Sequence, residues 1–429
     1  MTQSGADLET QAGPPGQGDG WRPRSVMVAT LAGAAMIAVV LVLQPWQWWM
    51  ADFAVYRAGG SAVVHGQPLY DVTTSTTPFA NMPFTYSPFA ALLFTPLAFL
   101  GTGFAQDTEA IVNFLALGAV LWLSLGLAGV RAPRRRLAIT AAAWIPAAML
   151  TPVVMTIVLG QLNILMMLLV LLDFAPGLPR RWRGIALGVA AGIKLTPMIF
   201  AVYLFAIGRR AEALRAAATF LVTVALGFLL LPRDSRAYWL DGVVFDAGRA
   251  VVSGKLINHS IPGLFARLAG TAAPPWWSLP IAVAVGVAGL AAAVSAHRRS
   301  QPMAALLITA FTGFLVSPIS WDHHAVWIVP ALVWLAAARW QRDSALPRVI
   351  LAAALVFFTV PVNWLSKQLG GEHWQLTGVG DLFVSLSGYL TVTIVALALL
   401  PVWLKRLATP PSVDKAPGPP RLPPTEERS

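Results

Sequence analysis

Long apolar stretches, separated by short polar turns, dominate the chain from residue 25 to residue 404. Most of them approach the roughly 20 residues that a helix needs to cross about 30 Å of hydrocarbon. The short alternating segments of a transmembrane β-barrel are absent from the sequence. The pattern therefore predicts an all-α polytopic membrane protein. Single spans are expected at residues 25–43, 110–130, 137–151, 156–173, 213–232, 279–297, 302–318, 325–338, 346–364 and 382–404.

Two more apolar segments do not fit as single crossings. Residues 184–207 lie between two basic clusters, so one crossing would leave one cluster outside. The interruption GIKLTP at 192–197 favours two shorter helices that form a hairpin. Pro88–Phe104 precedes a span that must itself begin outside, so this segment is expected to lie along the outer interface. Counting the hairpin as two, we expect about 12 membrane helices.

Basic residues gather between the apolar stretches and set the predicted orientation. Cytoplasmic loops carry an excess of Lys and Arg, so each cluster is expected on the cytoplasmic side. The clusters are Arg22/Arg24, Arg131/Arg134/Arg135/Arg136, Arg180/Arg181/Arg183, Arg209/Arg210/Arg215, Arg298/Arg299, Arg339/Arg342 and Lys405/Arg406. Both chain ends then lie in the cytoplasm as disordered polar tails, at 1–24 and 408–429, on either side of a membrane domain at 25–407.

The same orientation gathers the remaining loops on the outer face. Residues 45–109 form a first extracytoplasmic loop with interfacial helices, and residues 233–278 form a second large one. Shorter loops are expected at 319–324 and 365–381. Because these loops hold most of the polar residues outside the basic clusters, we expect the functional site on this face.

Composition excludes several classes of function. With 57% hydrophobic and 11% charged residues, the chain is too apolar for a soluble domain. The net charge of +11 is explained by the cytoplasmic clusters, so a nucleic-acid partner is not expected. The absence of cysteine excludes disulfides, Cys-ligated metals and thiol catalysis. P-loop, Rossmann, GxSxG and HExxH motifs are also absent, and if a sugar is transferred, a nucleotide-sugar donor is not expected.

Candidate residues begin in the first outer loop. Asp52 directly follows the first span, where an acidic residue needs a partner or a function. A helix N-cap or a salt bridge to Arg57 is the alternative explanation. Further along, the loop is rich in Pro and aromatic residues, which suits a lipid-facing groove but also simple anchoring. Tyr70 and Tyr86 are possible hydroxyl donors to a substrate.

Three polar residues are expected within the membrane. Gln161 and Asn163 lie in an otherwise apolar helix, where such side chains usually bond neighbouring helices. Lys194 lies in the predicted hairpin, and a lone ammonium there needs an anion or strong acceptors. A lysine that extends toward the cytoplasm is the alternative.

The segment SPISWDHHAVW at 317–327 places Asp322, His323 and His324 in a row on the outer face. Adjacent helical residues point about 100° apart, so the two histidines do not form a metal site easily, and hydrogen bonding or phosphate binding is favoured. We expect no bound metal or other cofactor. Asn258 and His259 add a polar group in the second large loop; its N-H-S triplet also matches the short glycosylation pattern.

Several motifs resemble, in the same order, those of one known family. They are DFAVYRAGG, HGQPLY, FTYSPFAALLFTPL, GQLN, GIKLTP, NHSIPGL and SPISWDHH, from residue 52 to residue 324. The chain resembles the bacterial polyprenol-phosphate-mannose-dependent α-1,2-mannosyltransferases of family 87, in the glycosyltransferase-C superfamily. This family includes mycobacterial enzymes that elongate phosphatidylinositol mannosides and others that branch lipomannan. In its length and tails the chain looks most like the former.

The resemblance implies a multi-pass enzyme of the plasma membrane with an extracytoplasmic active site. It implies that Asp52 is the catalytic base and that His324, beside His323, lies in the donor phosphate site. The expected reaction is an inverting transfer of mannose from polyprenol-phosphate-mannose to a phosphatidylinositol mannoside. Lys194 and Arg57 are further cations that could meet the phosphate. Lipomannan branching by the same chemistry and a transporter or flippase for a lipid-linked sugar are the alternatives.

Overall fold

The computed structural model describes residues 50–76, 79–246, 258–271 and 273–337, with a few more between 351 and 359. Both predicted tails and the spans expected at 25–43 and 382–404 lie outside the described residues. So do most of the span expected at 346–364, the outer loop at 365–381 and part of the second large loop.

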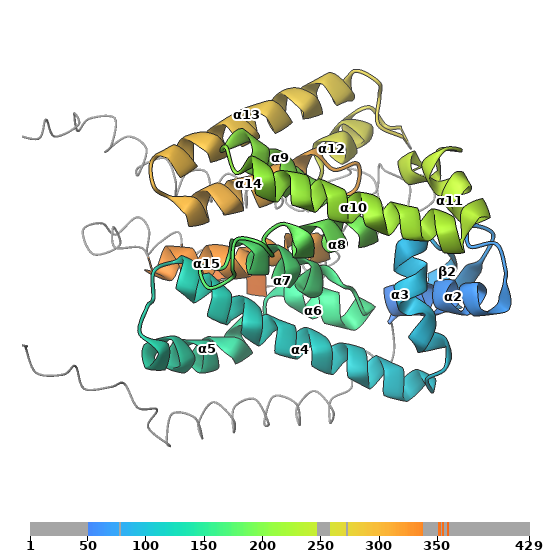
Figure 1. Ribbon diagram of the computed structural model, residues 1–429, viewed down its shortest axis with the longest axis horizontal. Coiled ribbons are helices and arrows are strands. Elements are labelled where there is room, and N and C mark those ends of the chain that lie inside the picture. The colour runs from blue at the N-terminus through green and yellow to red at the C-terminus, as the bar shows by residue number, and fades with distance from the viewer. Residues whose placement is uncertain are drawn as a thin grey trace, which may run out of the picture.

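Helices make up most of the described fold (Figure 1). The N-terminal half contains α2 (Ala51–His65), β1 (Thr73–Thr76), β2 (Phe79–Pro83), α3 (Pro88–Ala98), α4 (Thr102–Leu127), α5 (Pro133–Ala148), α6 (Thr151–Leu159), α7 (Asn163–Phe174), α8 (Ile185–Ile193) and α9 (Met198–Ala206). The remainder contains α10 (Arg210–Leu230), α11 (Pro232–Trp239), η2 (Val243–Phe245), α12 (Ile261–Leu268), α13 (Ser278–Arg298), α14 (Pro302–Val316), η4 (Asp322–Trp327) and α15 (Ile328–Ala337).

Three of these helices, α4, α10 and α13, are long and apolar enough to cross a membrane. The pair α5 and α6 also qualifies as one broken span, bent by 71°. Large apolar side chains on α10 and α13 are exposed, among them Leu221, Leu229, Leu279 and Val287. Such faces are unfavourable in water but suit hydrocarbon. The predicted class, a helical membrane protein, agrees with these helices.

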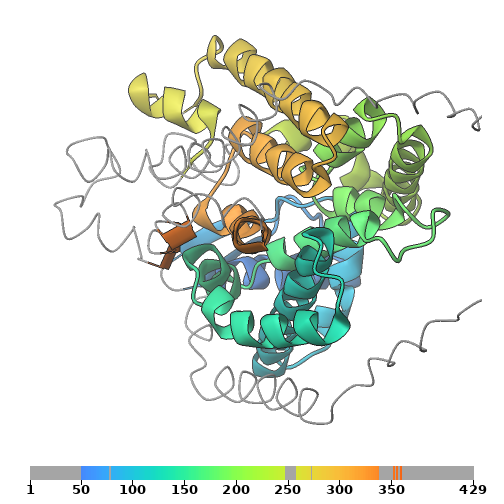
Figure 2. The same ribbon diagram turned by 90° about the vertical axis from the view of Figure 1, so that its left-hand side faces the viewer.

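The ends of the helices separate two kinds of surface. In Figure 1, α2, α3, the β1–β2 hairpin and α11 gather at the right-hand end. The turns that follow α4 and join α13 to α14 lie at the opposite end, and they carry Arg131, Arg134 and Arg298/Arg299. In Figure 2, α15 lies between the α13–α14 pair and the α4–α5 pair. Basic turns and the predicted outer loop thus occupy opposite ends of the molecule.

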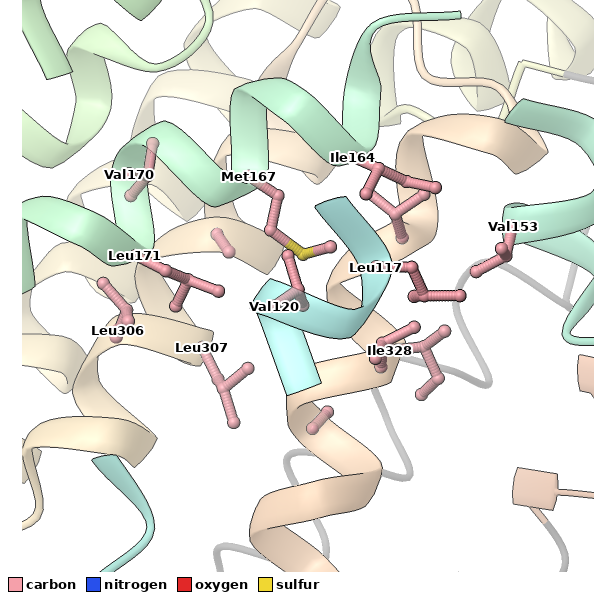
Figure 3. Packing of buried hydrophobic residues seen from close by; sticks show 14 of the residues in the cluster. Leu117, Val120, Val153, Ile164, Met167, Val170, Leu171, Leu306, Leu307 and Ile328 are labelled. Atoms are coloured by element: carbon pink, nitrogen blue, oxygen red, sulfur yellow. The ribbon is translucent and has the colours of Figure 1, made fainter. Parts of the chain in front are cut away.

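Buried aliphatic side chains from α4, α6, α7, α14 and the start of α15 form the main core (Figure 3). They come from helices far apart in the sequence, so the core joins the two halves of the chain. Each fully buried Leu, Ile or Met contributes roughly 1.5–3 kcal/mol in water, although in a bilayer close packing replaces much of this term. The labelled core residues are Leu117, Val120, Val153, Ile164, Met167, Val170, Leu171, Leu306, Leu307 and Ile328.

One predicted span is wrong in a way that matters for the site. Residues 156–173 do not form a continuous helix, because α6 ends at Leu159 and Gly160 adopts a left-handed conformation with φ 67°. Gln161 therefore lies between two helices and Asn163 begins α7. Residues without a Cβ adopt this conformation readily, which is why the break falls at a glycine.

The break predicted from GIKLTP is confirmed. Helix α8 ends at Ile193, Lys194 is extended with φ −143°, and α9 begins at Met198. The segment predicted as the first outer loop contains the β1–β2 hairpin, which the sequence did not predict, and α3 ends at Ala98, earlier than expected. Ser87 caps α3 by accepting from the Ala90 amide, and it donates to the Gly192 carbonyl at 2.5 Å. That bond ties the first outer loop to the end of α8.

Candidate active site

Helix α2 brings Asp52 against the break between α6 and α7. The Met50 amide donates to the Val158 carbonyl at 3.0 Å, which fixes the start of α2 on the last turn of α6. Asp52 lies in the first turn of α2, where a carboxylate is favoured by the helix dipole. Its carboxyl group is hydrogen bonded to the Gln161 side chain. The alternative ion pair between Asp52 and Arg57 is not formed.

Two tyrosine side chains contact Gln161, the hydrogen-bond partner of Asp52, and form a wall of the site. The Tyr56 hydroxyl donates to Gln161 Oε1 at 2.8 Å and lies 2.9 Å from the Tyr86 hydroxyl. Tyr86 makes a longer bond of 3.4 Å to the same Gln161 oxygen. Because Gln161 is bonded from both sides, its amide orientation and its contact with Asp52 are fixed.

The carboxyl group of Asp52 has a raised pKa. Burial raises the pKa of Asp52 from about 3.8 to about 6, while the hydrogen bond from Gln161 and the positive charge of Lys194 act in the opposite direction. A carboxyl group with this pKa is ionised at neutral pH yet is a stronger base than an ordinary aspartate.

Lys194 faces the same space from the break between α8 and α9. Its ammonium nitrogen lies 3.2 Å from His324 Nε2 and 5.9 Å from the centre of the Tyr86 ring. An ammonium group can only donate, so the imidazole nitrogen accepts. Since Lys194 also acts electrostatically on Asp52, a buried carboxyl group and a cation share one site. This arrangement favours the inward orientation of Lys194 over the cytoplasmic alternative.

The η4 turn places the two histidines differently. The His323 carbonyl accepts from Asn163 Nδ2 at 2.9 Å and from Thr156 Oγ1 at 3.2 Å, so the backbone is held by α6 and α7. His324 is the histidine that meets Lys194, and its ring stacks on Trp321. Burial and the charge of Lys194 lower the pKa of His324 well below its usual range, so the ring is neutral at pH 7.

A cavity of about 90 Å³ opens beside Lys194 and His324. Its other lining groups are mostly apolar and include Met167, Phe200 and Trp327. Asn163, Ser317 and Ser320 supply polar groups. A cation in the lining of a mostly apolar cavity suits an amphiphilic anion such as a lipid phosphate.

Other predicted site residues lie away from this space. Arg57 is bonded to the turn between α3 and α4, donating to the Leu97 carbonyl at 3.2 Å and the Leu100 carbonyl at 3.0 Å. Tyr70 donates to the Tyr86 carbonyl at 3.0 Å and stacks on Tyr238, within an aromatic cluster. Both residues support the first outer loop and do not face the Asp52–Lys194 space.

Asn258, His259 and Asp322 form a second polar cluster beside η4. His259 Nε2 lies 2.6 Å from Asp322 Oδ1, and Asn258 bonds the loop before η4. Among the described residues, no group of three or more His, Asp or Glu side chains is arranged to hold a metal ion.

Sequence reasoning missed Tyr56, Asn113 and Glu109. Asn113 donates to Glu109 and to the Gln161 carbonyl, and both groups are close to the Asp52 site. A detectable signal was present in each case. Tyr56 is four residues after Asp52 and so lies on the same helix face, and Glu109 and Asn113 are polar residues four apart in an apolar span.

We expect Gly160→Ala to destabilise the protein by about 2 kcal/mol, because a left-handed backbone and a lack of space act together. A Cβ at this position would lie 2.5 Å from Phe53 Cβ and 2.6 Å from Met50 Sδ. A lower melting temperature of the purified protein in detergent would show the effect. Gly177→Ala is the matched control, because nothing lies near a Cβ there; equal melting temperatures for the two variants would contradict the expectation.

The fold and site define an integral membrane enzyme, and comparison with known proteins identifies its class. The family model of glycosyltransferase family 87 matches residues 84–318, more than half of the chain. The chain belongs to this family and is a glycosyltransferase. The resemblance seen in its motifs is thereby confirmed, and an enzyme is favoured over the transporter alternative.

Similar proteins of known name come from mycobacteria. The chain is 35% identical to the polyprenol-phosphate-mannose-dependent alpha-(1-2)-phosphatidylinositol pentamannoside mannosyltransferase of Mycobacterium tuberculosis (strain CDC 1551 / Oshkosh), over 76% of this chain and 75% of the relative. It is 32% identical to the corresponding phosphatidylinositol mannoside mannosyltransferase of strain ATCC 25618 / H37Rv, over 81% and 84%. An enzyme of that second name from Mycolicibacterium smegmatis is 34% identical, over 76% and 78%.

Proposed function

We propose that this enzyme is an inverting α-1,2-mannosyltransferase. It takes mannose from polyprenol-phosphate-mannose and adds it to a phosphatidylinositol mannoside. The observation that carries the proposal is that Asp52, whose pKa is raised by burial, lies close enough to interact electrostatically with Lys194, which with His324 lines an apolar cavity. The names of the similar mycobacterial enzymes support the same donor and acceptor.

In the proposed reaction Asp52 removes the proton from the 2-hydroxyl group of the acceptor mannose. The hydroxyl oxygen attacks the anomeric carbon of the β-linked donor from the side opposite the phosphate. The bond between the anomeric carbon and the phosphate oxygen breaks, its electron pair stays on the phosphate, and an α linkage forms. The proton remains on Asp52 until it is lost to solvent. General-base assistance of this kind contributes typically ~10²–10⁴-fold to the rate.

The leaving polyprenyl phosphate gains one negative charge, and this charge needs a partner. Lys194 supplies a positive charge inside the site, and His324 limits its movement. The polyprenyl chain runs along the apolar wall beyond Lys194, in the cavity next to Phe200 and Trp327. No metal ion is required for this step, since the cation is a side chain.

The proposal also includes a location. The site faces the extracytoplasmic side of the plasma membrane, both chain ends are cytoplasmic, and α3 lies along the outer interface. Support comes from the basic turns at the end of the molecule opposite α2, α3 and α11. The total of about 12 membrane helices remains the prediction made from segment length.

The test is transfer of mannose by purified protein from synthetic polyprenol-phosphate-mannose to phosphatidylinositol mannosides of increasing length. An α-1,2-linked product that also forms in the presence of a chelator supports the proposal. A product formed only on lipomannan would reassign the acceptor. Absence of transfer to every acceptor, or strict dependence on a divalent ion, would contradict the proposed mechanism.

We expect the reaction to lose activity below about pH 6, the raised pKa of Asp52. The base must be ionised to accept a proton, so protonation of Asp52 in acid removes the active form. Below the pKa, kcat/KM should fall about tenfold for each pH unit, and above it the profile should be flat. An acid limb near pH 4, typical of an exposed aspartate, would contradict the burial of this group.

A further inference from the structure

A cluster of hydrogen-bonded polar residues beside η4 connects the segment before α12 to the loop that leads into η4. We name it the outer clamp, and its residues are Asn258, His259, Ser260, Arg267, Ser320 and Asp322. Asn258, His259, Ser260 and Ser320 are each no more than 2% exposed. Burial of this kind is unfavourable unless the polar groups are bonded, so their arrangement is specific.

Backbone bonds in the outer clamp fix the loop that leads into η4. The His259 amide donates to the Ser320 carbonyl at 2.7 Å, and the Ser320 amide donates to Asn258 Oδ1 at 2.9 Å. Asn258 Nδ2 donates to the Pro318 carbonyl at 3.1 Å. Gly263 leaves room for the Asn258 side chain, which would be 2.5 Å from a Cβ there. The start of α12 therefore sets the path of the chain just before His324.

A hydrogen-bonded pair completes the outer clamp. His259 Nε2 lies 2.6 Å from Asp322 Oδ1, and because an ionised carboxylate only accepts, the imidazole nitrogen carries the hydrogen and donates it. Asp322 is two residues before His324, and its charge acts on His323. His259 in turn acts electrostatically on His324. The pair therefore acts electrostatically on the two histidines of η4, and one of these, His324, contacts Lys194.

Asp322 places a carboxylate two residues before His324, although its side chain is not part of the cavity lining. A negative charge close to the donor phosphate lowers its affinity unless a neighbour compensates the charge. The N–H of His259 reduces this charge locally by donating to the carboxylate, and stacking on Phe314 holds the ring in line with that oxygen. Through the same hydrogen bond, Asp322 anchors η4 to the second large outer loop.

We propose that His259 and Asp322 are positioning residues for the donor site: together they hold His324 toward Lys194, and His259 offsets the repulsion between Asp322 and the donor phosphate. This inference rests on the proposed function, which places that phosphate at Lys194 and His324. It reassigns Asn258, His259 and Asp322 from substrate contacts to support of the η4 turn.

The test is a double-mutant cycle in the mannose-transfer assay with purified full-length protein. His259→Ala removes the imidazole that donates to Asp322, so the KM for polyprenol-phosphate-mannose should rise on the order of tenfold while the KM for the acceptor stays constant. Asp322→Asn removes the charge and should change the donor KM less than about threefold. The donor KM of the double variant should be closer to that of Asp322→Asn than to that of His259→Ala.

That partial rescue separates the proposal from a purely structural role, which would make the double variant at least as impaired as His259→Ala. His65→Ala, at an exposed position at the end of α2, is the matched control. Where His259→Ala does not fold, His259→Gln is the substitute, because its amide keeps a donor to Asp322. It should raise the donor KM by less than the roughly tenfold increase expected for His259→Ala. A cycle without rescue, or an equal rise in both KM values, would overturn the inference. Failure of the wild-type protein to transfer mannose would instead overturn the proposed function, and this inference with it.

Discussion

Asp52→Asn should lower kcat by about 10²–10⁴-fold, because the amide cannot accept the proton of the acceptor hydroxyl. The substitution preserves size, and the Asn side chain can still bond Gln161, so the wall formed by Tyr56 and Tyr86 should remain in place. The measurement is single-turnover mannose transfer at pH 7.5, with donor binding determined separately. We expect the donor Kd to change much less than the rate.

Asp71→Asn is the control for this experiment, because Asp71 is an exposed carboxyl group in the same outer loop. It should leave both the rate and the pH profile unchanged. An Asp52→Asn enzyme as fast as the wild type would remove Asp52 from the mechanism. Glu109 would then become the carboxyl group to test, since it lies in the adjoining hydrogen-bond network.

Lys194→Met should reduce kcat/KM by about 10²–10³-fold, the usual effect of removing one group that stabilises developing charge. The Met side chain fills similar space but carries no charge, so the leaving phosphate loses its cation. Lys194→Arg keeps the charge with a different shape and should retain more activity than Lys194→Met. Rates measured with donors whose leaving phosphates differ in pKa would show a steeper dependence for Lys194→Met.

The control for Lys194 is Arg236→Gln on α11, an exposed cation whose side chain lies near Asp241. It should alter activity less than about twofold, because exposed charges are screened by salt. Comparable losses for Arg236→Gln and Lys194→Met would indicate a general effect of surface charge on binding to anionic lipids. That result would contradict a specific phosphate contact at Lys194.

The sequence supported the prediction of helices and of individual polar candidates, because both depend on local properties. An apolar stretch of the right length is visible without a structure, and a charge such as Lys194 in such a stretch is conspicuous. The break at Gly160 was missed because a glycine is often tolerated within an apolar helix. The structure shows that this glycine is left-handed and lies against Met50 and Phe53, so a residue without a Cβ is required at the end of α6.

The pairing of the candidates could not be predicted from the sequence. Lys194 and His324 are 130 residues apart, and Tyr56 and Gln161 are 105 apart, so their contacts depend on how the helices pack. For the same reason Arg57 could be considered a phosphate ligand, although its guanidinium group is bonded to the turn after α3. Residue type indicated which side chains need a partner; the packing of α2, α6 and η4 determined which partner each one has.

These long separations also have a consequence for biosynthesis. During synthesis α2 is made long before η4 exists, and the Asn163–His323 bond spans 160 residues. Contacts of this kind form late, after the intervening helices have packed. A partly synthesised chain, or one truncated before η4, would therefore contain Asp52 but lack His324. Such a chain could not place the Lys194–His324 pair beside Asp52.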